Sequence, residues 1–274
     1  MTKQINFALI FLLLALAYNA AFYYRRKLFV NRALNFKLAG LITLFCYALC
    51  LGVITWFCYP ASLFSPVTSF EGRLLTLLTY SAGSQGFFIT LIILCIWALS
   101  IRKLRRGMLQ KFLQLGLLLI IGFASKSGLK LATESPRPYS ELLAAEQIID
   151  SPADFYRLDD TEKAQAISAI AKNVSSWRSQ HWQGEKDYSF PSGHTLFAAI
   201  CVAFFGAAFL SAKRYGALVL LLVWASCVAY SRLWLGMHRP VDLFGSWAFV
   251  AVVFILLPNH LPFVSQWISR LAKQ

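Results

Sequence analysis

Seven long apolar stretches constrain this chain more than any other feature of its sequence. They cover residues 5–24, 38–58, 78–100, 112–130, 193–211, 215–231 and 242–258. A helix needs roughly 20 apolar residues to cross about 30 Å of hydrocarbon, and these stretches have about that length. The chain is also 58% hydrophobic, which exceeds the value of an ordinary soluble domain. We therefore predict an all-α fold, a polytopic membrane helix bundle.

The charges outside these stretches predict how the bundle is oriented. Lysine and arginine outnumber aspartate and glutamate by 26 to 12. Basic residues gather in 25–37, 101–111, 212–214 and the C-terminal tail, whereas all acidic residues fall on the opposite side of the predicted bundle. Because short basic loops stay in the cytoplasm, we expect the N-terminus and the acidic segments to lie outside it. No basic stripe alternates with exposed aromatic residues, so we expect no nucleic-acid partner.

Three segments are expected along the chain. Residues 1–37 form an N-terminal transmembrane helix and a basic cytoplasmic loop, and the charge asymmetry around 5–24 favours a retained helix over a cleaved signal peptide. Residues 38–260 form the transmembrane core. Residues 261–274 form an interfacial cytoplasmic tail.

The core includes a polar insert at residues 131–190. Asp159 and Glu162 have the spacing of a capping box, which predicts the start of a helix. The apolar residues that follow at helical spacing are Ile167, Ile170, Ala171, Val174 and Trp177. We predict one amphipathic helix that packs over the outer mouth of the bundle. A lipid-binding surface is the alternative for its apolar stripe.

The last of three polar blocks, Ser231-Arg232-x5-His238-x3-Asp242, joins the sixth and seventh apolar stretches. A neutral imidazole can attack phosphorus, and a nearby carboxylate can hold its second nitrogen and stabilise the charge that forms. His238 is therefore the candidate nucleophile and Asp242 its orienting partner. An aspartate at a helix start beside an interfacial histidine would give the same pattern without catalysis.

The middle block, Pro191-Ser192-Gly193-His194-Thr195, precedes the fifth apolar stretch. Ser192 is a typical N-cap, and the free N–H groups of a first helical turn form an anion site. Gly193 lets the backbone approach a phosphate closely, and His194 is the candidate general acid and base. Ser-Gly at a helix start is also a common cap with no further role.

The first block, Lys130-x6-Arg137-Pro138, ends the fourth apolar stretch. Arg137 offers a planar fork for two phosphate oxygens, and Lys130 offers a point charge. Basic residues at a helix end can also extend toward lipid headgroups without forming a phosphate site.

The three blocks together indicate phosphoryl transfer, which depends mostly on positioning and on stabilising charge at the phosphoryl oxygens. The candidate phosphate-binding residues are Lys130, Arg137, Ser192, Gly193 and Arg232. No carboxylate or histidine cluster has metal-ligand spacing, so we expect neither a metal nor another cofactor. Of the four histidines, His181 lies in the insert and His260 at the opposite membrane face, which leaves His194 and His238 as the functional pair.

These blocks resemble the three-part signature of the type 2 phosphatidic acid phosphatase superfamily: K-x6-RP, PSGH and SR-x5-H-x3-D. Every defined position is present with the correct internal spacing. The resemblance covers about residues 33–258 and includes Asp154-Phe155-Tyr156, Ser189-Phe190 and Leu235-Gly236-Met237. Within the superfamily, the chain is similar to the bacterial enzymes that act on phosphatidylglycerophosphate.

The resemblance implies a six-helix transmembrane core, to which residues 5–24 would add a seventh span. It implies a phosphohistidine on His238, with Asp242 and His194 in the roles given above. The implied substrates are membrane lipids with phosphate or diphosphate headgroups, namely phosphatidylglycerophosphate, which gives phosphatidylglycerol, and undecaprenyl diphosphate, which gives undecaprenyl phosphate. The implied location is the inner membrane of a Gram-negative bacterium, with the site facing the periplasm.

Alternatives remain at this level. A phosphotransferase would pass the phosphoryl group from His238 to a lipid acceptor such as lipid A through the same site. Vanadium haloperoxidases share the phosphate-gripping motif, but seven predicted spans argue against that class. A non-catalytic transporter or scaffold would need polar residues at the membrane midplane, where the apolar stretches are nearly uncharged. The sequence predicts neither the oligomeric state nor the preferred lipid.

Overall fold

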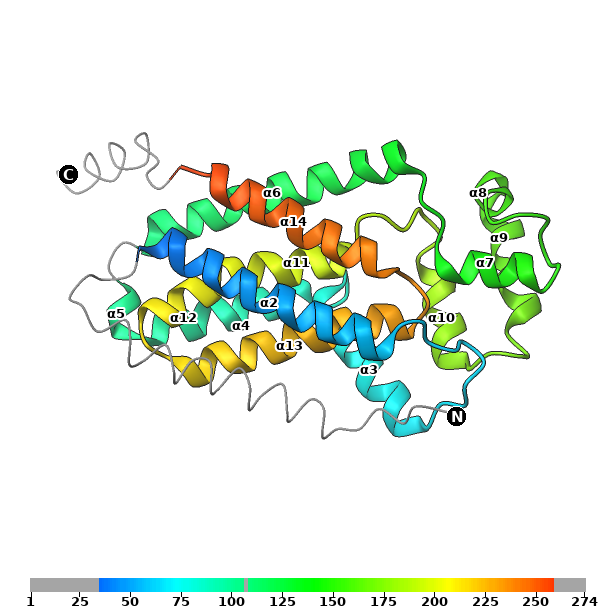
Figure 1. Cartoon of the computed structure of the whole chain (residues 1–274), viewed down its shortest axis with the longest axis horizontal. Coiled ribbons are helices and arrows are strands. Elements are labelled where there is room, and N and C mark those ends of the chain that lie inside the picture. The colour runs from blue at the N-terminus through cyan, green and yellow to red at the C-terminus, as the bar shows by residue number, and fades with distance from the viewer. Residues whose placement is uncertain (1–34, 106–107, 259–274) are drawn as a thin grey trace.

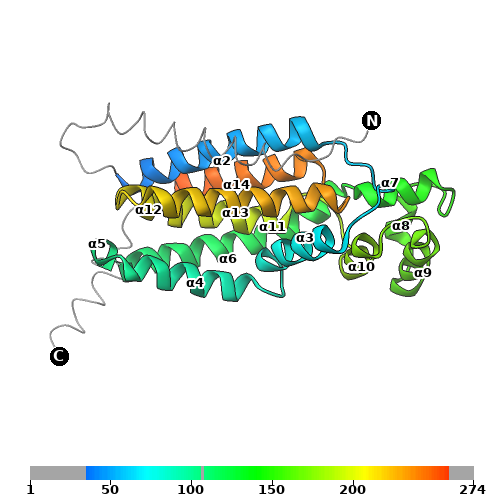
Figure 2. The same ribbon diagram turned by 90° about the horizontal axis from the view of Figure 1, so that it is seen from below.

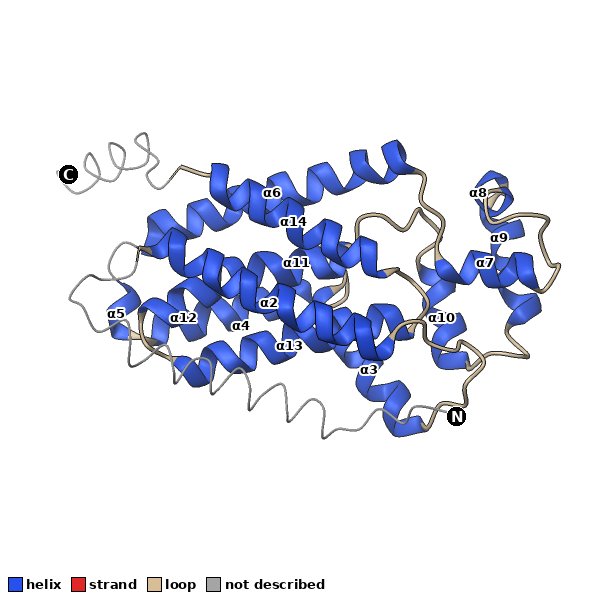
Figure 3. Ribbon diagram, in the orientation of Figure 1, coloured by secondary structure: helices blue, strands red, loops and turns tan. Residues whose placement is uncertain are grey.

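The computed structural model describes residues 35–105 and 108–258, and this part of the chain is helical with no strand (Figure 3). The all-α prediction is confirmed. The predictions for residues 5–24 and 261–274 lie outside the described residues. The helices are α2 (Phe36–Cys58), α3 (Ser69–Ala82), α4 (Phe87–Ser100), α5 (Arg102–Arg105), α6 (Met108–Thr133), α7 (Pro138–Ala145), α8 (Asp154–Arg157), α9 (Asp160–Ile170), α10 (Ser176–Gly184), α11 (Gly193–Cys201), the π-helical turn η1 (Val202–Gly206), α12 (Ala207–Ser211), α13 (Tyr215–Trp234) and α14 (Pro240–Leu256).

The apolar helices form an elongated bundle, and α7 to α10 gather at one end of it (Figures 1 and 2). Four helical segments are long and apolar enough to cross a membrane: α2, α6 counted with α7, the run from α11 to α12, and α13. The bent pair α3 and α4 makes a fifth if it is one span, and α14 is apolar but has only 17 residues. The bundle is therefore polytopic, as expected.

The prediction of one continuous helix over residues 78–100 is wrong. The chain breaks between α3 and α4, whose axes differ by 73°. Gly83 ends α3 and Gly86 precedes α4. A Cβ atom on Gly86 would lie 2.7 Å from the Tyr80 carbonyl oxygen, and one on Gly83 would lie 2.6 Å from Nε2 of His194. The two glycines therefore permit a close turn that leaves room for the His194 ring.

The run α11–η1–α12 is the central helix of the bundle. Every residue from Thr195 to Phe209 is buried, and α2, α6, α13 and α14 pack against this run. The π-helical turn disturbs the regular backbone pairing, and Thr43 of α2 donates a hydrogen bond to the Val202 carbonyl oxygen at 3.0 Å. A hydroxyl that satisfies a backbone carbonyl is a typical polar link between membrane helices.

The insert docks on the end of the bundle through a second apolar cluster. Tyr139 of α7 stacks on Trp182 of α10, with ring centroids 5.2 Å apart. Trp182 Nε1 donates to the Leu235 carbonyl oxygen at 2.7 Å, and Arg178 Nε donates to the Trp234 carbonyl oxygen at 3.1 Å. The insert therefore holds the segment that leads from α13 to His238.

The predicted capping box is confirmed, but the single long helix of the insert is not. The Asp159 carboxylate accepts from the Glu162 N–H at 2.8 Å, and the Glu162 carboxylate accepts from the Asp159 N–H at 2.9 Å. The helix ends at Ile170, and Trp177 belongs to α10. The apolar spacing continues across the turn because both helices face the same cluster, which contains Ile167, Ile170, Val174, Trp177 and Trp182.

Close packing of α2 against its neighbours gives a test of the fold. A Cβ atom on Gly40 would lie 2.4 Å from Cε1 of Phe254 and 2.7 Å from the Ala203 carbonyl oxygen. We expect Gly40→Ala to destabilise the protein by about 1–3 kcal/mol, because overpacking forces helices apart. Thermal unfolding in detergent measures the change.

Gly52→Ala, on the same helix, is the matched control because nothing lies within 4 Å of its Cβ position. This variant should be neutral or slightly more stable, since alanine favours a helix more than glycine. Equal unfolding temperatures for the two variants would contradict the packing described for α2.

Candidate active site

The structure brings the three polar blocks together at the end of the bundle that carries the insert (Figure 1). Lys130 lies in the last turn of α6, Arg137 caps α7, and Arg232 lies in the last turn of α13. Arg137 Nη1 donates to the carbonyl oxygen of Met237, next to His238, at 3.1 Å. The Ser192 N–H donates to the Asp242 carbonyl oxygen at 3.3 Å. Segments far apart in the sequence are therefore joined directly.

The middle block begins α11 as expected. Ser192 is the N-cap, and its Oγ accepts from the Thr195 N–H at 3.4 Å. Ser246 of α14 donates to the Ser192 carbonyl oxygen at 2.9 Å, which fixes the cap against α14. A Cβ atom on Gly193 would lie 3.0 Å from Cδ of Lys126. Lys126 therefore lies beside the N-terminus of α11, a position that favours anions. The sequence motifs did not include this lysine.

In the last block, the candidate nucleophile and its carboxylate are in contact, and Ser189, from the segment just before the middle block, contacts both. His238 Nδ1 lies 3.3 Å from Asp242 Oδ2, and Ser189 Oγ lies 3.2 Å from the same Nδ1. Ser189 also donates a short hydrogen bond to Asp242 Oδ2, and the Arg239 N–H donates to that oxygen at 2.8 Å. Asp242 is thus both a helix-start residue of α14 and the partner of His238. Because an ionised carboxylate only accepts, this contact assigns the proton to Nδ1 and leaves the lone pair on Nε2.

His238 is almost fully buried, and this sets its charge. Burial lowers the pKa of His238 to about 4, and the positive charges of Arg137 and Arg232 act in the same direction. The hydrogen bond to Asp242 raises the pKa but does not compensate. The imidazole is therefore neutral near pH 7, which is the form that can attack phosphorus.

The cations of the site are buried and share two carboxylates of the insert. Arg232 donates from Nη2 to Oε1 and Oε2 of Glu185 at 2.8 and 2.9 Å, and Arg137 Nη2 lies 3.3 Å from the same carboxylate. Asp187 accepts from Arg137 Nη2 at 2.5 Å and pairs with Lys130 Nζ at 2.9 Å. The two acids therefore balance a charge cluster that would be costly to bury alone.

Both acids are ionised in this setting. Burial acts to raise the pKa of Glu185, but the charges of Arg232, His194 and Arg137 outweigh it and hold the pKa well below its usual range. For Asp187, Arg137 and Lys130 likewise outweigh burial and lower the pKa. His194 Nε2 lies 4.0 Å from Oε1 of Glu185. Two of the three candidate phosphate-binding cations, Arg137 and Arg232, thus contact the Glu185 carboxylate, and one of the two candidate histidines, His194, lies beside it.

Sequence reasoning missed several polar residues of this site. They are Thr79, whose Oγ1 accepts from Arg232 at 2.7 Å, with Lys126, Glu185, Asp187 and Ser189. For Glu185, Asp187 and Ser189, the available signal was their position just before Pro191. Among the described residues, no three His, Cys, Asp or Glu side chains gather as metal ligands.

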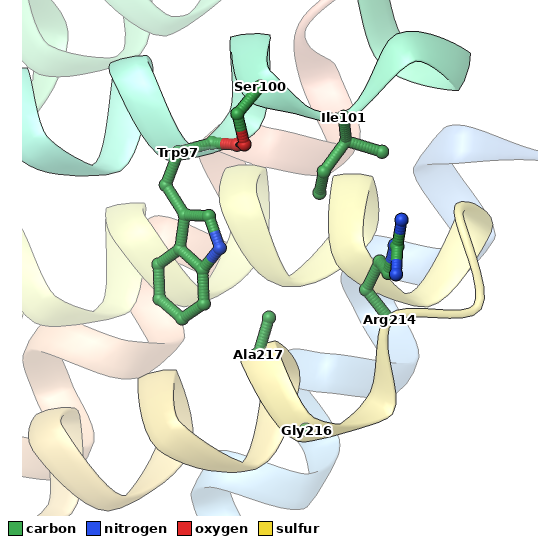
Figure 4. Close-up of a pocket in the computed structure, with 6 residues that line it drawn as sticks. All are labelled: Trp97, Ser100, Ile101, Arg214, Gly216 and Ala217. Carbon is green, nitrogen blue, oxygen red and sulfur yellow. Dashed lines mark hydrogen bonds between the residues drawn. The ribbon is translucent and has the colours of Figure 1, made fainter.

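A pocket of about 420 Å³ lies at the other end of the bundle (Figure 4). Its lining residues are Trp97, Ser100, Ile101, Arg214, Gly216 and Ala217. The lining holds one cation and no histidine or carboxylate, so it offers no such base to activate the Ser100 hydroxyl.

Neutral histidine, oriented carboxylate, buried arginines and a helix N-terminus form a set of groups that can bind and transfer a phosphoryl group. The sequence profile of the PAP2 superfamily matches residues 111–265, which is more than half of the chain. The chain therefore belongs to the PAP2 superfamily, the type 2 phosphatidic acid phosphatases.

Named relatives make the similarity more specific. Phosphatidylglycerophosphatase B of Haemophilus influenzae is 32% identical over 206 residues, which cover 69% of this chain and 83% of the relative. The proteins of the same name from Escherichia coli K12 and Shigella flexneri are each 36% identical over 173 residues, or 60% of this chain and 67% of the relative. With its apolar helices, the protein is a multi-pass membrane lipid phosphatase.

Ser189 gives a test of the site geometry. We expect Ser189→Ala to lower kcat by about tenfold with little change in KM, because one hydrogen bond that orients a charged partner is lost. Initial rates of phosphate release from a lipid substrate measure both constants. Ser189→Thr keeps a hydroxyl at this position and should recover most of the rate; equal loss in both variants would show that the hydroxyl does not orient Asp242.

Proposed function

We propose that the protein hydrolyses phosphate and diphosphate headgroups of membrane lipids through a phosphohistidine on His238. The observation that carries the proposal is the contact of His238 Nδ1 with the buried carboxylate of Asp242 at 3.3 Å. That arrangement holds the ring in the tautomer that presents a lone pair to phosphorus. Asp242 also stabilises the positive charge that develops on the ring.

In the first step, Nε2 of His238 bonds to phosphorus as the bond to the leaving oxygen breaks. His194 donates its proton to that oxygen, which belongs to an alcohol in a monoester and to a phosphate in a diphosphate. In the second step, His194 takes a proton from water, and the water oxygen displaces His238 from phosphorus. Orthophosphate and the original protonation states result.

Lys130, Arg137 and Arg232, with Ser192 and the N–H groups of Gly193 and His194, are proposed to hold the phosphoryl oxygens. Within the described residues, the buried Nε of Arg232 has no hydrogen-bond partner, so this guanidinium retains a donor for a ligand oxygen. Three cations and a helix N-terminus supply the stabilisation that a metal provides in other phosphatases. We therefore propose metal-independent catalysis.

The proposed substrates are phosphatidylglycerophosphate and undecaprenyl diphosphate, and the proposed location is the periplasmic face of the inner membrane. The site lies where α6, α11, α13 and α14 meet the polar insert, so lipid tails can stay in the bilayer while the headgroup reaches the cations. The names of the relatives support the first substrate. The distribution of basic residues supports the orientation.

The loss of His238 tests the nucleophile. We expect His238→Ala to lower phosphate release from either lipid by at least about a thousandfold, because the covalent route is removed. The wild-type rate should persist in EDTA. Purified full-length protein in detergent is assayed for both effects.

His181→Asn is the matched control for this variant. His181 lies in α10, and its contacts are with α3: it lies 3.3 Å from Thr76 Oγ1 and against the ring of Tyr80. It should retain most of the activity. Substantial lipid hydrolysis by His238→Ala would refute the mechanism, and phosphoryl transfer to added lipid A without release would indicate a phosphotransferase.

His194 should act in both steps, and an activated leaving group separates them. With p-nitrophenyl phosphate, departure of nitrophenolate needs no acid, so only the water-attack step should slow in His194→Ala. We expect a burst of about one nitrophenolate per protein, then turnover slowed by about 10²–10⁴-fold, the usual contribution of a general base. With substrate labelled at the phosphoryl group, quenching in alkali should recover labelled phosphohistidine. Steady fast turnover without a burst would exclude the base role.

A further inference from the structure

The Glu185 carboxylate lies among groups that are proposed to act on the phosphoryl group. Its two carboxylate oxygens accept from Arg232, approach Arg137 and lie near His194. These are the groups proposed to bind and protonate the substrate. A carboxylate and a phosphate share the charged oxygens that such donors recognise.

The side chain of Glu185 can leave without unfolding its surroundings. Its backbone N–H donates to the Trp182 carbonyl oxygen at 3.3 Å, and its own carbonyl oxygen accepts from Tyr139 Oη at 3.0 Å. The backbone is therefore anchored, whereas the side chain is 31% exposed. Rotation about side-chain bonds alone would move the carboxylate to solvent.

We propose that Glu185 is an internal competitor for the phosphate site, displaced by the substrate headgroup and returning as orthophosphate leaves. The proposal rests on the function proposed above. Because the backbone stays in place, the displaced carboxylate remains near the mouth of the site at a high effective concentration. It therefore shortens the time for which the product can hold the cations, and it keeps those cations paired between turnovers.

An internal competitor has a quantitative signature. The apparent dissociation constant of any ligand is its intrinsic value divided by the fraction of protein whose site is open. Removing the competitor should therefore tighten all ligands of the site by the same factor. A residue that touches the ligand would change different ligands by different factors, and a residue that only supports the fold would weaken them.

Glu185→Gln in the full-length protein tests this signature. Calorimetry gives the dissociation constants of orthophosphate and orthovanadate without turnover, and the assay gives their inhibition constants against phosphatidylglycerophosphate. We expect both ligands to bind at least about fivefold tighter, by a common factor, while kcat does not rise. Unchanged or weaker binding, or a tightening that differs between the two ligands, would overturn the proposal.

Two further variants make the result decisive. Glu146→Gln removes an exposed charge from the same insert and should leave the dissociation constants of both ligands unchanged. An equal tightening in this variant would refute the proposal, because it would show that net charge alone causes the effect. Glu185→Asp keeps the charge on a shorter side chain and should tighten both ligands by less than Glu185→Gln. If Glu185→Gln fails to fold, unchanged binding in Glu185→Asp overturns the proposal. Absence of lipid hydrolysis by the wild type would instead refute the proposed function, and calorimetry would still test the competitor.

Discussion

The ion pairs between the buried arginines and the acids of the insert are the interaction on which the rest of this site depends. Arg137, before α7, and Arg232, in the last turn of α13, are almost completely removed from solvent, and burying both without a compensating charge would be costly. Glu185 and Asp187 supply that charge from a segment outside the bundle. The two acids of the insert therefore balance the buried cations of the proposed phosphate site.

The groups of the site come from helix ends, and each end contributes something that a helix interior cannot. The start of α11 offers unpaired N–H groups, and the start of α14 places Asp242 one turn after His238. The ends of α6 and α13 bring Lys130 and Arg232 out of the bundle. Rigid helices packed around α11–α12 hold these ends at fixed positions relative to one another. The arrangement of the helix ends is therefore set before any ligand binds.

Much of this arrangement follows from sequence because its signals are local. Apolar stretches of membrane-spanning length, the Ser192 N-cap and the Asp159 capping box all depend on neighbouring residues. Within the described residues, four of the apolar stretches form helices long enough to span a membrane, and both caps are found. The break at Gly83 was missed because hydropathy continues across it, and the side chain that needs the space at Gly83 is a histidine more than a hundred residues away. Glu185, Asp187 and Ser189 were missed for the same reason: their roles depend on partners that only the fold brings near.

The hydrogen bonds from Arg178 and Trp182 to Trp234 and Leu235 have a consequence for how such proteins can diverge. The last carbonyl groups of any helix lack partners within that helix, and here two side chains of the insert serve as the missing cap of α13. Shortening or exchanging α10 would leave those carbonyls without donors and release the segment that ends in His238. The insert can therefore vary on the solvent face of α9. Arg178 and Trp182 of α10 are constrained, because they hold the segment before His238 without contacting His238 themselves.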